Sequence, residues 1–239
     1  MDQTIESWRE KLKRRVLHMQ ESDFEALALE VFRFQATFNP LYQQYTNLSG
    51  VDPEKVNHWT EIPFLPIELF KNHQVLTGSA PVLFSFESSG TTGQIPSKHP
   101  VCDPKFYQEI SKIAFEQEYG PLSDYHIFAL LPSYLERSTS SLVFMMDHFI
   151  QESGSDLSGF YLNQYEELAD ALRAALATEK KVWLMGVTFG LLDLVDSGID
   201  LSFLKEHKNR LIVMETGGMK GRREEWIRDK VHAYLQEKM

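Results

Sequence analysis

At residues 82–93 the chain has the sequence Val82-Leu83-Phe84-Ser85-Phe86-Glu87-Ser88-Ser89-Gly90-Thr91-Thr92-Gly93. The first five residues are apolar apart from one serine, which is typical of a buried strand. The last six are small residues that carry either a hydroxyl group or no side chain. Glycine allows a tight turn and lets backbone N–H groups approach an anion. The stretch therefore predicts a strand that leads into a phosphate-holding loop.

The loop is distinct from two well-known phosphate loops. Its hydroxyls and glycines are Ser88, Ser89, Gly90, Thr91, Thr92 and Gly93. Hydroxyl groups donate hydrogen bonds to phosphate without burying a charge, and Lys98 offers a positive charge a few residues later. A Walker loop would need Gly-Lys-Ser or Gly-Lys-Thr, and a dinucleotide fingerprint would need Gly-x-Gly-x-x-Gly. The alternative interpretation is a solvated connecting turn, because Ser, Thr and Gly are common in such turns.

From residue 81 onward, strand-like and helical segments alternate. Short apolar runs predict further strands at residues 126–131, 159–162, 182–187 and 211–214. Helical segments lie between them, the clearest at 166–177, and a charged helix is expected at 222–237. This alternation predicts an α/β fold with a mostly parallel sheet flanked by helices. We assign residues 81–239 to this nucleotide-binding region.

Residues 1–80 have a helical pattern instead. Apolar residues recur at helical spacing at Ile5, Trp8, Leu12 and Val16. A second helix is expected to end at Asn39-Pro40, and a short third one near Gly50. Pro63 and Pro66 exclude a regular helix at that point and predict an extended, packed connector. We therefore expect a helical N-terminal region that packs on the α/β core.

A second glycine turn, Thr216-Gly217-Gly218, follows the last predicted strand. In an open α/β sheet, ligands bind beyond the carboxyl ends of the strands. The two glycine loops are therefore expected to face one crevice. The alternative interpretation is an ordinary tight turn between a strand and a helix.

Composition narrows the classes of partner. The 239 residues carry a formal net charge of −10, which argues against nucleic acid, because its binding proteins present Lys and Arg to phosphates. The longest apolar runs are too short for membrane insertion, and the polar N-terminus is unlike a secretory signal. The single cysteine, Cys102, forms no internal disulfide. These features favour a soluble, cytoplasmic protein.

The six residues from Ser88 to Gly93 resemble the phosphate loop of the adenylate-forming enzymes, which include acyl-CoA synthetases, luciferases and peptide-synthetase adenylation domains. In that superfamily a strand leads into Ser-Gly-Thr-Thr-Gly, followed by proline and lysine. Here Pro96 and Lys98 come later than in the usual pattern. The resemblance implies that the loop grips the phosphates of ATP, with Mg²⁺ as the accompanying cation.

The same resemblance implies roles for two later segments. In adenylate-forming enzymes a glycine-rich turn lies against adenine, and Gly217-Gly218 occupies the corresponding place. The segment at 182–190 resembles the one that walls the acyl pocket in that superfamily. We therefore expect Gly186 and Thr188 at the pocket.

Several segments together are similar to the LuxE-type acyl-protein synthetases, relatives of the phenylacetate-CoA ligases. They are Ile62-Pro63-Phe64-Leu65-Pro66 with Leu69-Phe70-Lys71, the loop at 87–93, Met146-Asp147-His148-Phe149 and Thr216-Gly217-Gly218-Met219-Lys220-Gly221. Members of that family activate a fatty acid with ATP to an acyl-adenylate and pass the acyl group to a thiol. In family terms, His148 falls where an acyl-pocket histidine is expected. The resemblance assigns no catalytic residue.

The family also has an aromatic-Gly-x-Thr-Glu motif and a small C-terminal domain beyond the last helix of this chain. We therefore expect these 239 residues to be the N-terminal, ATP-binding part of an acyl-protein synthetase-like ligase, with little activity alone. Its partners would be a carboxylic acid and, as acceptor of the acyl group, a protein thiol or CoA. A phenylacetate-type CoA ligase and a non-catalytic acyl- or nucleotide-binding protein are the alternatives.

Other reactive residues have weaker patterns. Cys102 lacks an evident activating cation apart from His99, and a buried structural thiol is the preferred interpretation. Asp147 and His148 are adjacent on an expected helix, so their side chains point in different directions. The eight histidines show no spacing typical of zinc ligands.

Overall fold

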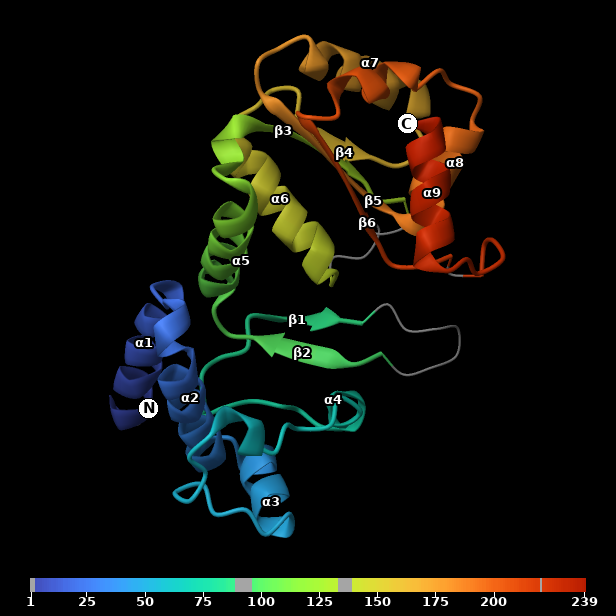
Figure 1. Ribbon diagram of the computed structural model, residues 1–239. Coiled ribbons are helices and arrows are strands. Elements are labelled where there is room, and N and C mark those ends of the chain that lie inside the picture. Colours follow the sequence, from blue (N-terminus) through green and yellow to red (C-terminus); the bar gives the residue numbers. More distant parts are fainter. Residues whose placement is uncertain (1–2, 89–95, 133–138, 220) are drawn as a thin grey trace. The chain divides into compact units, whose positions relative to one another are not determined.

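The computed structural model describes residues 3–88, 96–132, 139–219 and 221–239 (Figure 1). The chain forms two compact units, Met1–Ile113 and Ala114–Met239. The division falls inside helix α5 (Pro104–Tyr119). The N-terminal helices and a two-stranded sheet belong to the first unit, and a four-stranded sheet with its covering helices belongs to the second.

Helices α1 (Gln3–Leu17) and α2 (Phe24–Phe38) pack together through the apolar spacing seen in the sequence. Leu12 of α1 is buried and clusters with Leu27 and Phe34 of α2. The other three predicted α1 positions pack around this cluster: Ile5, Trp8 and Val16. The helical pattern predicted for the start of the chain is therefore confirmed.

Asn39 separates α2 from α3 (Pro40–Leu48). Its backbone is extended, as expected for a residue before proline. The Asn39 side-chain oxygen accepts a hydrogen bond from the N–H of Tyr42 at 3.1 Å and so caps α3. Pro40 occupies the first turn, where a missing N–H does no harm. The predicted helix end at Asn39-Pro40 is confirmed.

The connector after α3 is only partly packed. Ile62 and Leu65 pack against a buried cluster of α2 and α3 side chains, whereas Phe64 is 67% and Ile67 72% exposed. The predicted extended backbone is present, and the predicted packing is confirmed at Ile62 and Leu65 but not at the two exposed residues. The short elements of this region are η1 (Glu21–Asp23), η2 (Trp59–Glu61) and α4 (Leu69–Asn72).

The strand before the Ser/Thr/Gly loop pairs differently from the prediction. Strand β1 (Phe84–Glu87) is antiparallel to β2 (Lys98–Val101), and the two form a separate sheet (Figure 1). We expected this strand to belong to the mostly parallel sheet. The four residues of β2 include Pro100 and lack an alternating apolar pattern, so no strand was predicted there. A short loop suffices to join antiparallel strands.

The second unit contains the predicted parallel sheet. Its strands are β3 (Tyr125–Leu130), β4 (Gly159–Tyr161), β5 (Lys181–Val187) and β6 (Leu211–Thr216). They are ordered β4-β3-β5-β6 and every neighbouring pair is parallel. All six residues of β3 are buried, as is typical of a parallel strand covered on both faces. The α/β class is therefore confirmed.

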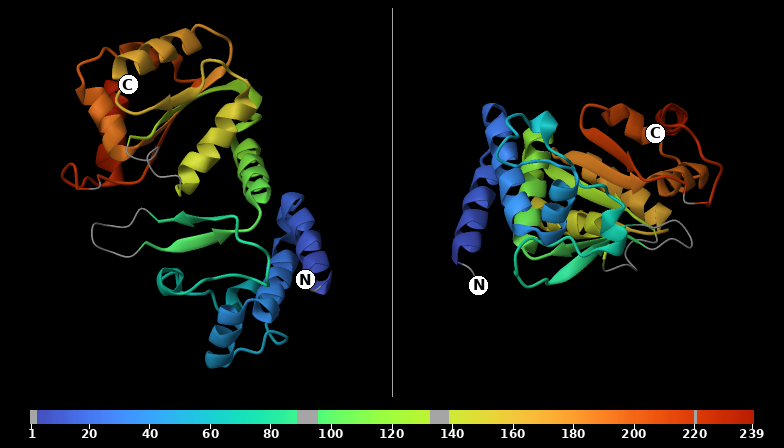
Figure 2. Two further views of the ribbon diagram at one scale, coloured as in Figure 1. Left: turned by 180° about the vertical axis from the view of Figure 1, so that it is seen from behind. Right: turned by 90° about the horizontal axis from the view of Figure 1, so that it is seen from below.

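Helices lie over both faces of the four-stranded sheet (Figure 1; Figure 2, left), and alternate residues of its central strands belong to two different cores. One core joins Ile127 and Trp183 to Phe115 of α5 and to α6 (Ser141–Ser153). The other joins Phe128 and Leu184 to the helices of the opposite face. Those helices are α7 (Tyr165–Leu176), α8 (Thr188–Asp196) and α9 (Arg228–Lys238). The sheet is thus covered by helices on both faces.

The last helix begins later than predicted. We expected it to run over 222–237, but α9 begins at Arg228. The guanidinium of Arg223 is instead paired with Asp193 and Asp196 of α8, which holds the preceding segment in a non-helical course. Two short helical turns complete the unit, η3 (Leu122–Asp124) and η4 (Ser202–His207). Among the helices described, none combines the length and the apolar composition that a bilayer crossing requires.

Candidate functional site at the carboxyl ends of the parallel strands

The candidate site lies where β5 and β6 end side by side. Val187, the last residue of β5, is in register with Thr216, the last residue of β6. The chain then enters α8 directly at Thr188 and a glycine turn at Gly217. Since ligands of open α/β sheets bind beyond the carboxyl ends of the strands, this edge is the candidate ligand-binding edge of the second unit.

Thr188 and Glu215 form a nearly buried polar pair at this edge. Thr188 is 3% exposed, and its hydroxyl donates a short hydrogen bond to Oε1 of Glu215. The Glu215 side chain is 9% exposed, and its Oε2 lies 3.8 Å from Nε2 of His232 on α9. A carboxylate this buried is expensive unless it is hydrogen-bonded or paired with a cation. The arrangement therefore places a scarcely solvated acidic group at the end of β6.

The glycine turn exposes its backbone. Gly217 has φ of +88°, which lies in the region that favours glycine, and a Cβ built there would meet nothing within 4 Å. A Cβ at Gly218 would meet only Oε2 of Glu225, at 3.7 Å. Both glycines therefore leave room for a flat group to approach the main chain.

The segment after the turn is held to α8 by an ion-paired arginine, and α9 contacts one of the same carboxylates. Arg223 contacts Oδ1 of Asp193 at 2.5 Å and Oδ2 of Asp196 at 2.6 Å, and Tyr234 donates to Oδ1 of Asp196 at 2.6 Å. The hydrogen bonds from Tyr234 and from Arg223 lower the pKa of Asp196 below its usual value. Met219 is buried beside them in the core. These contacts fix the course of the chain beyond the glycines.

Gly186 and Thr188, the two expected pocket residues from β5 and α8, both have close neighbours in the fold. A Cβ at Gly186 would lie 2.5 Å from Cγ of Leu191, so the packing of α8 against β5 requires glycine there. Thr188 faces Glu215 and also lies 3.4 Å from the carbonyl oxygen of Thr216. Their roles toward a substrate stay predictions.

His148 lies on α6 and is half-buried, with its ring 6.2 Å from that of Phe149. Its neighbour Asp147 accepts a hydrogen bond from Gln151 one helical turn later, at 2.8 Å. The two side chains thus have separate contacts, in line with the expectation for adjacent residues on a helix. The acyl-pocket role of His148 stays a prediction.

Most of the predicted phosphate loop, Ser89-Gly90-Thr91-Thr92-Gly93, lies outside the described residues. Its base is described and lies in the first compact unit. The N–H of Ser88 donates to the carbonyl of Ser97, and its hydroxyl oxygen accepts from the N–H of Ser97, both at 2.9 Å. Ser88 therefore closes the base of the loop.

Lys98 lies directly after this base and opposite Glu87 in the β1–β2 register. Its Nζ is 3.4 Å from Oε1 of Glu87, and the Lys98 side chain is 62% exposed. Its positive charge is therefore partly offset by a neighbouring carboxylate. Thr216, Gly217 and Gly218 belong to the second unit.

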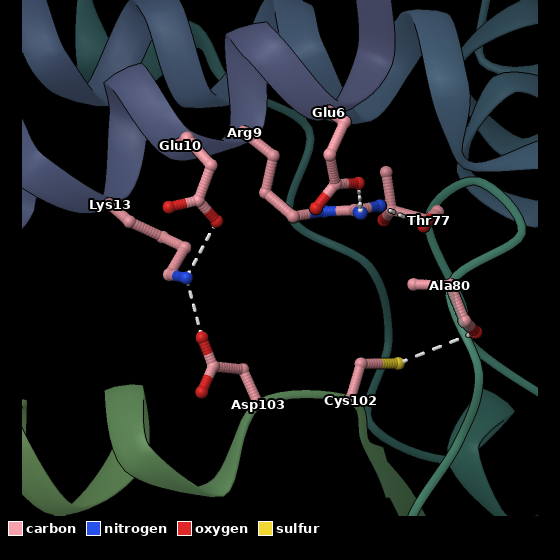
Figure 3. Close-up of polar contacts among 8 residues, drawn as sticks. All are labelled: Glu6, Arg9, Glu10, Lys13, Thr77, Ala80, Cys102 and Asp103. Atoms are coloured by element: carbon pink, nitrogen blue, oxygen red, sulfur yellow. Dashed lines mark hydrogen bonds and ion pairs between the residues drawn. The ribbon is translucent and has the colours of Figure 1, made fainter. Parts of the chain in front are cut away.

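Cys102 is surrounded by paired charges at the end of β2 (Figure 3). Its Sγ lies 3.8 Å from the carbonyl oxygen of Ala80. Burial, together with the carboxylates of Asp103 and Glu6, raises the pKa of the thiol, although Arg9 acts in the opposite direction. A raised pKa lowers the thiolate fraction, so this environment suits a structural thiol better than a nucleophile.

Lys13 ties α1 to the start of α5 beside Cys102. Its Nζ lies 2.7 Å from Oε1 of Glu10 and 2.5 Å from Oδ2 of Asp103 (Figure 3). Asp103 also accepts a hydrogen bond from the N–H of Phe106 at 3.1 Å, which caps α5. The bonds from Lys13 and from the α5 backbone outweigh burial and lower the pKa of Asp103. The cluster therefore connects α1 to the start of α5 within the first unit.

Glu215 and His232 were not singled out in the sequence. A signal for Glu215 was present, because it is the one acidic residue in an otherwise apolar strand, Leu211-Ile212-Val213-Met214-Glu215. His232 carried no comparable signal, since it lies on a charged helix far along the chain. Within the described part of the chain, no group of three or more His, Cys, Asp or Glu residues is arranged to hold a metal ion.

Searches against protein-family models, curated proteins and solved structures give no match to this chain.

Proposed function

We propose that the protein takes part in the ATP-dependent activation of a carboxylic acid, of the fatty-acid class, to an acyl-adenylate, followed by transfer of the acyl group to a thiol. The observation that best supports this function is the open glycine turn at the carboxyl end of β6. Gly217 has a left-handed backbone, and nothing fills the space that its missing side chain leaves. The proposal also rests on the resemblance of the 88–93 loop and the 216–221 segment to the acyl-protein synthetases.

In the adenylate-forming enzymes that this chain resembles, two segments contact the nucleotide, and here the corresponding segments belong to different compact units. The base would lie against the backbone of Gly217 and Gly218, where a larger residue would strain the turn or crowd the ligand. The hydroxyls of Ser89, Thr91 and Thr92, with the N–H groups of the loop, would hold the phosphates. Lys98 would add a positive charge, which the carboxylate of Glu87 partly offsets. The neutral donors of the loop would therefore contribute most of the affinity for the phosphates.

The chemistry requires positioning and charge neutralisation. A carboxylate oxygen attacks the α-phosphorus of ATP, a new P–O bond forms, and the bond to the pyrophosphate leaving group breaks. The thiol of the acceptor then attacks the acyl carbon and releases AMP. Mg²⁺ bound to the phosphates would neutralise their charge, and the loop would orient them for in-line attack.

Carboxylate-dependent exchange of labelled pyrophosphate into ATP tests the proposal. The full-length protein would be assayed with a panel of straight-chain fatty acids and aryl acids. Exchange that depends on a fatty acid is the expected result. The absence of exchange with every acid, measured on a preparation that is folded, would overturn the enzymatic proposal.

The same assay separates the two alternatives. Exchange stimulated by aryl acids, with CoA as the thiol that accepts the acyl group, would identify a phenylacetate-type CoA ligase. Saturable ATP binding without exchange would identify a non-catalytic nucleotide-binding protein.

The role of the loop can be tested separately with the double variant Thr91→Val, Thr92→Val. Each hydroxyl that donates to a charged phosphate contributes about 1.5–3 kcal/mol, so we expect the loss of both to lower the ATP affinity at least about a hundredfold. Isothermal titration calorimetry measures the change, with Thr60→Val as the control, because Thr60 is exposed and lies in η2. Unchanged affinity in the double variant would remove the loop from the binding site.

A further inference from the structure

A cavity of about 540 Å³ in the second unit lies between one face of β6 and helix α9. Five of its lining residues are apolar: Leu204, Leu211, Val213, Leu235 and Met239. The other four are polar or charged: Lys208, Glu215, His232 and Gln236. Its size falls within the range of pockets that hold small organic molecules. It involves none of the residues predicted to hold the nucleotide, the phosphates or the acyl group.

The alternation of β6 explains which side chains reach this cavity. Leu211, Val213 and Glu215 point to the face that α9 covers, whereas Ile212 and Met214 pack in the core on the other face. β6 is at the edge of the sheet, and α9 packs on α8 (Figure 1). The cavity therefore runs along an apolar strand face and ends at a single carboxylate.

That carboxylate lacks a full set of hydrogen-bond donors. Oε1 of Glu215 accepts from the hydroxyl of Thr188. In the described part of the chain, Oε2 accepts no hydrogen bond; Nε2 of His232 lies 3.8 Å away, which is too long for a hydrogen bond but close enough for an ion pair when the histidine is protonated. A nearly buried carboxylate normally receives several donors. The second oxygen of Glu215 is therefore available to a donor brought by a ligand in the cavity.

We propose that this cavity is a binding site for a small organic cation with an apolar body, such as a primary alkylammonium ion. The ammonium group would donate to Oε2 of Glu215, and the alkyl chain would lie along Leu211, Val213 and Leu235. Lys208 lines the cavity near the start of β6, and its charge disfavours a second cationic group at that end. The four-residue step from Leu211 to Glu215 limits the ligand to about 13 Å at about 3.3 Å per residue.

The proposal is tested by methyl NMR of the 239-residue chain titrated with hexylammonium chloride, with hexanoate and hexanol as ligands of the same length. The methyl resonances of Leu211, Val213, Leu235 and Met239 are expected to shift on addition of hexylammonium. Hexanol should bind more weakly because it carries no charge, and hexanoate should not bind because Glu215 repels it. This readout needs neither ATP nor acyl transfer, so it is independent of the proposed function.

Matched variants decide whether Glu215 is responsible. Glu215→Gln keeps the shape and removes the charge, and it should weaken hexylammonium binding about tenfold, or about 1.4 kcal/mol. Glu206→Gln makes the same charge change at an exposed position of η4 and should leave the affinity within about twofold. Val213→Phe fills the cavity without a change of charge and should abolish binding, which keeps the test valid if Glu215→Gln unfolds.

Three results with the ligand series and the charge variants would overturn the proposal. They are the absence of methyl shifts at millimolar hexylammonium, binding of hexanoate as strong as that of hexylammonium, and an equal loss of affinity in Glu206→Gln and Glu215→Gln. Retained binding in a folded Val213→Phe variant would overturn it as well, since the ligand would then lie elsewhere.

Discussion

Strands β1 and β6 both lead into a glycine-containing loop, yet the two loops have different structural settings. The loop after β1 returns to an antiparallel partner, and two hydrogen bonds between Ser88 and Ser97, one of them to the Ser88 hydroxyl oxygen, close its base. The turn after β6 leaves a parallel sheet at its carboxyl edge, beside a buried threonine and a nearly buried glutamate. A glycine loop after an apolar strand therefore does not by itself define a ligand edge. The partner of the strand decides which surface the loop joins.

The surroundings of the two strands differ as much as their loops. The four residues of β1 include one buried residue, Phe86. The sheet that contains β6 is built on strands such as β3, which is buried throughout. We therefore expect the second unit to tolerate truncation of its core side chains far less well than the hairpin.

The largest expected effect is that of Phe128→Ala in β3. Phe128 is completely buried, so removal of its ring should destabilise the second unit by about 3–5 kcal/mol. Phe84→Ala in the half-buried β1 should have a smaller effect. Native-state hydrogen exchange measures both, because it reports the opening of β5 and of β1 separately. Equal losses of stability in the two variants would show that the two sheets do not differ in their tolerance of truncation.

A smaller effect on stability is expected from substitutions in the glycine turn, where the two glycines should respond differently. Gly217→Ala places a side chain at φ of +88° and should destabilise the second unit by about 1–2 kcal/mol. Gly218→Ala, which has no such constraint, should change stability by less than about 0.5 kcal/mol. Thermal unfolding compares the two variants. Similar melting temperatures for both would show that the left-handed conformation does not constrain the turn.

The smallest effect is a dependence of stability on pH, which each unit should show through one histidine. Nδ1 of His126 in β3 is hydrogen-bonded to Oγ of Ser155 at 2.5 Å, and its Nε2 is hydrogen-bonded to Oγ1 of Thr178 at 2.8 Å. Burial, and then the charge of Lys180, lower its pKa below 6.5. Burial also lowers the pKa of His99 in the hairpin.

The direction of this pH dependence follows from the difference in proton binding between the folded and the unfolded chain. Because the unfolded chain binds the proton more tightly, the contribution of each histidine to stability is complete above about pH 6.5 and is lost as the pH falls through the lower folded-state pKa. Hydrogen exchange at a series of pH values measures the loss in each unit. His126→Asn should flatten the profile of the second unit and leave that of the hairpin unchanged. If it changed both profiles equally, the two units would not respond separately.

Local patterns were enough to predict most elements. The apolar runs at 126–131, 182–187 and 211–214 are strands, and the spacing of Ile5, Trp8, Leu12 and Val16 marks the packed face of α1. Asn39-Pro40 marks a helix boundary because proline restricts the residue before it. Such signals depend on neighbours within a few residues, so they can be recognised without the fold.

Pairing and helix limits were harder to predict. β2 has four residues, one of them proline, and forms against β1 without a pattern of its own. The start of α9 depends on Arg223, which binds carboxylates about 30 residues earlier in the chain. Neither interaction leaves a signal within a short window of sequence, because each depends on contact between distant segments.

Part of the candidate site could likewise be predicted from the sequence, and part of it could not. The residue types alone predicted a glycine turn at the end of the last strand, and the left-handed Gly217 fits that prediction because few other residues adopt its conformation. The pairing of Glu215 with Thr188 and its approach to His232 required the assembled sheet, since β5, β6 and α9 come together only when the chain folds. Spacing along a chain reveals a turn, whereas the burial of a charge depends on everything that packs around it.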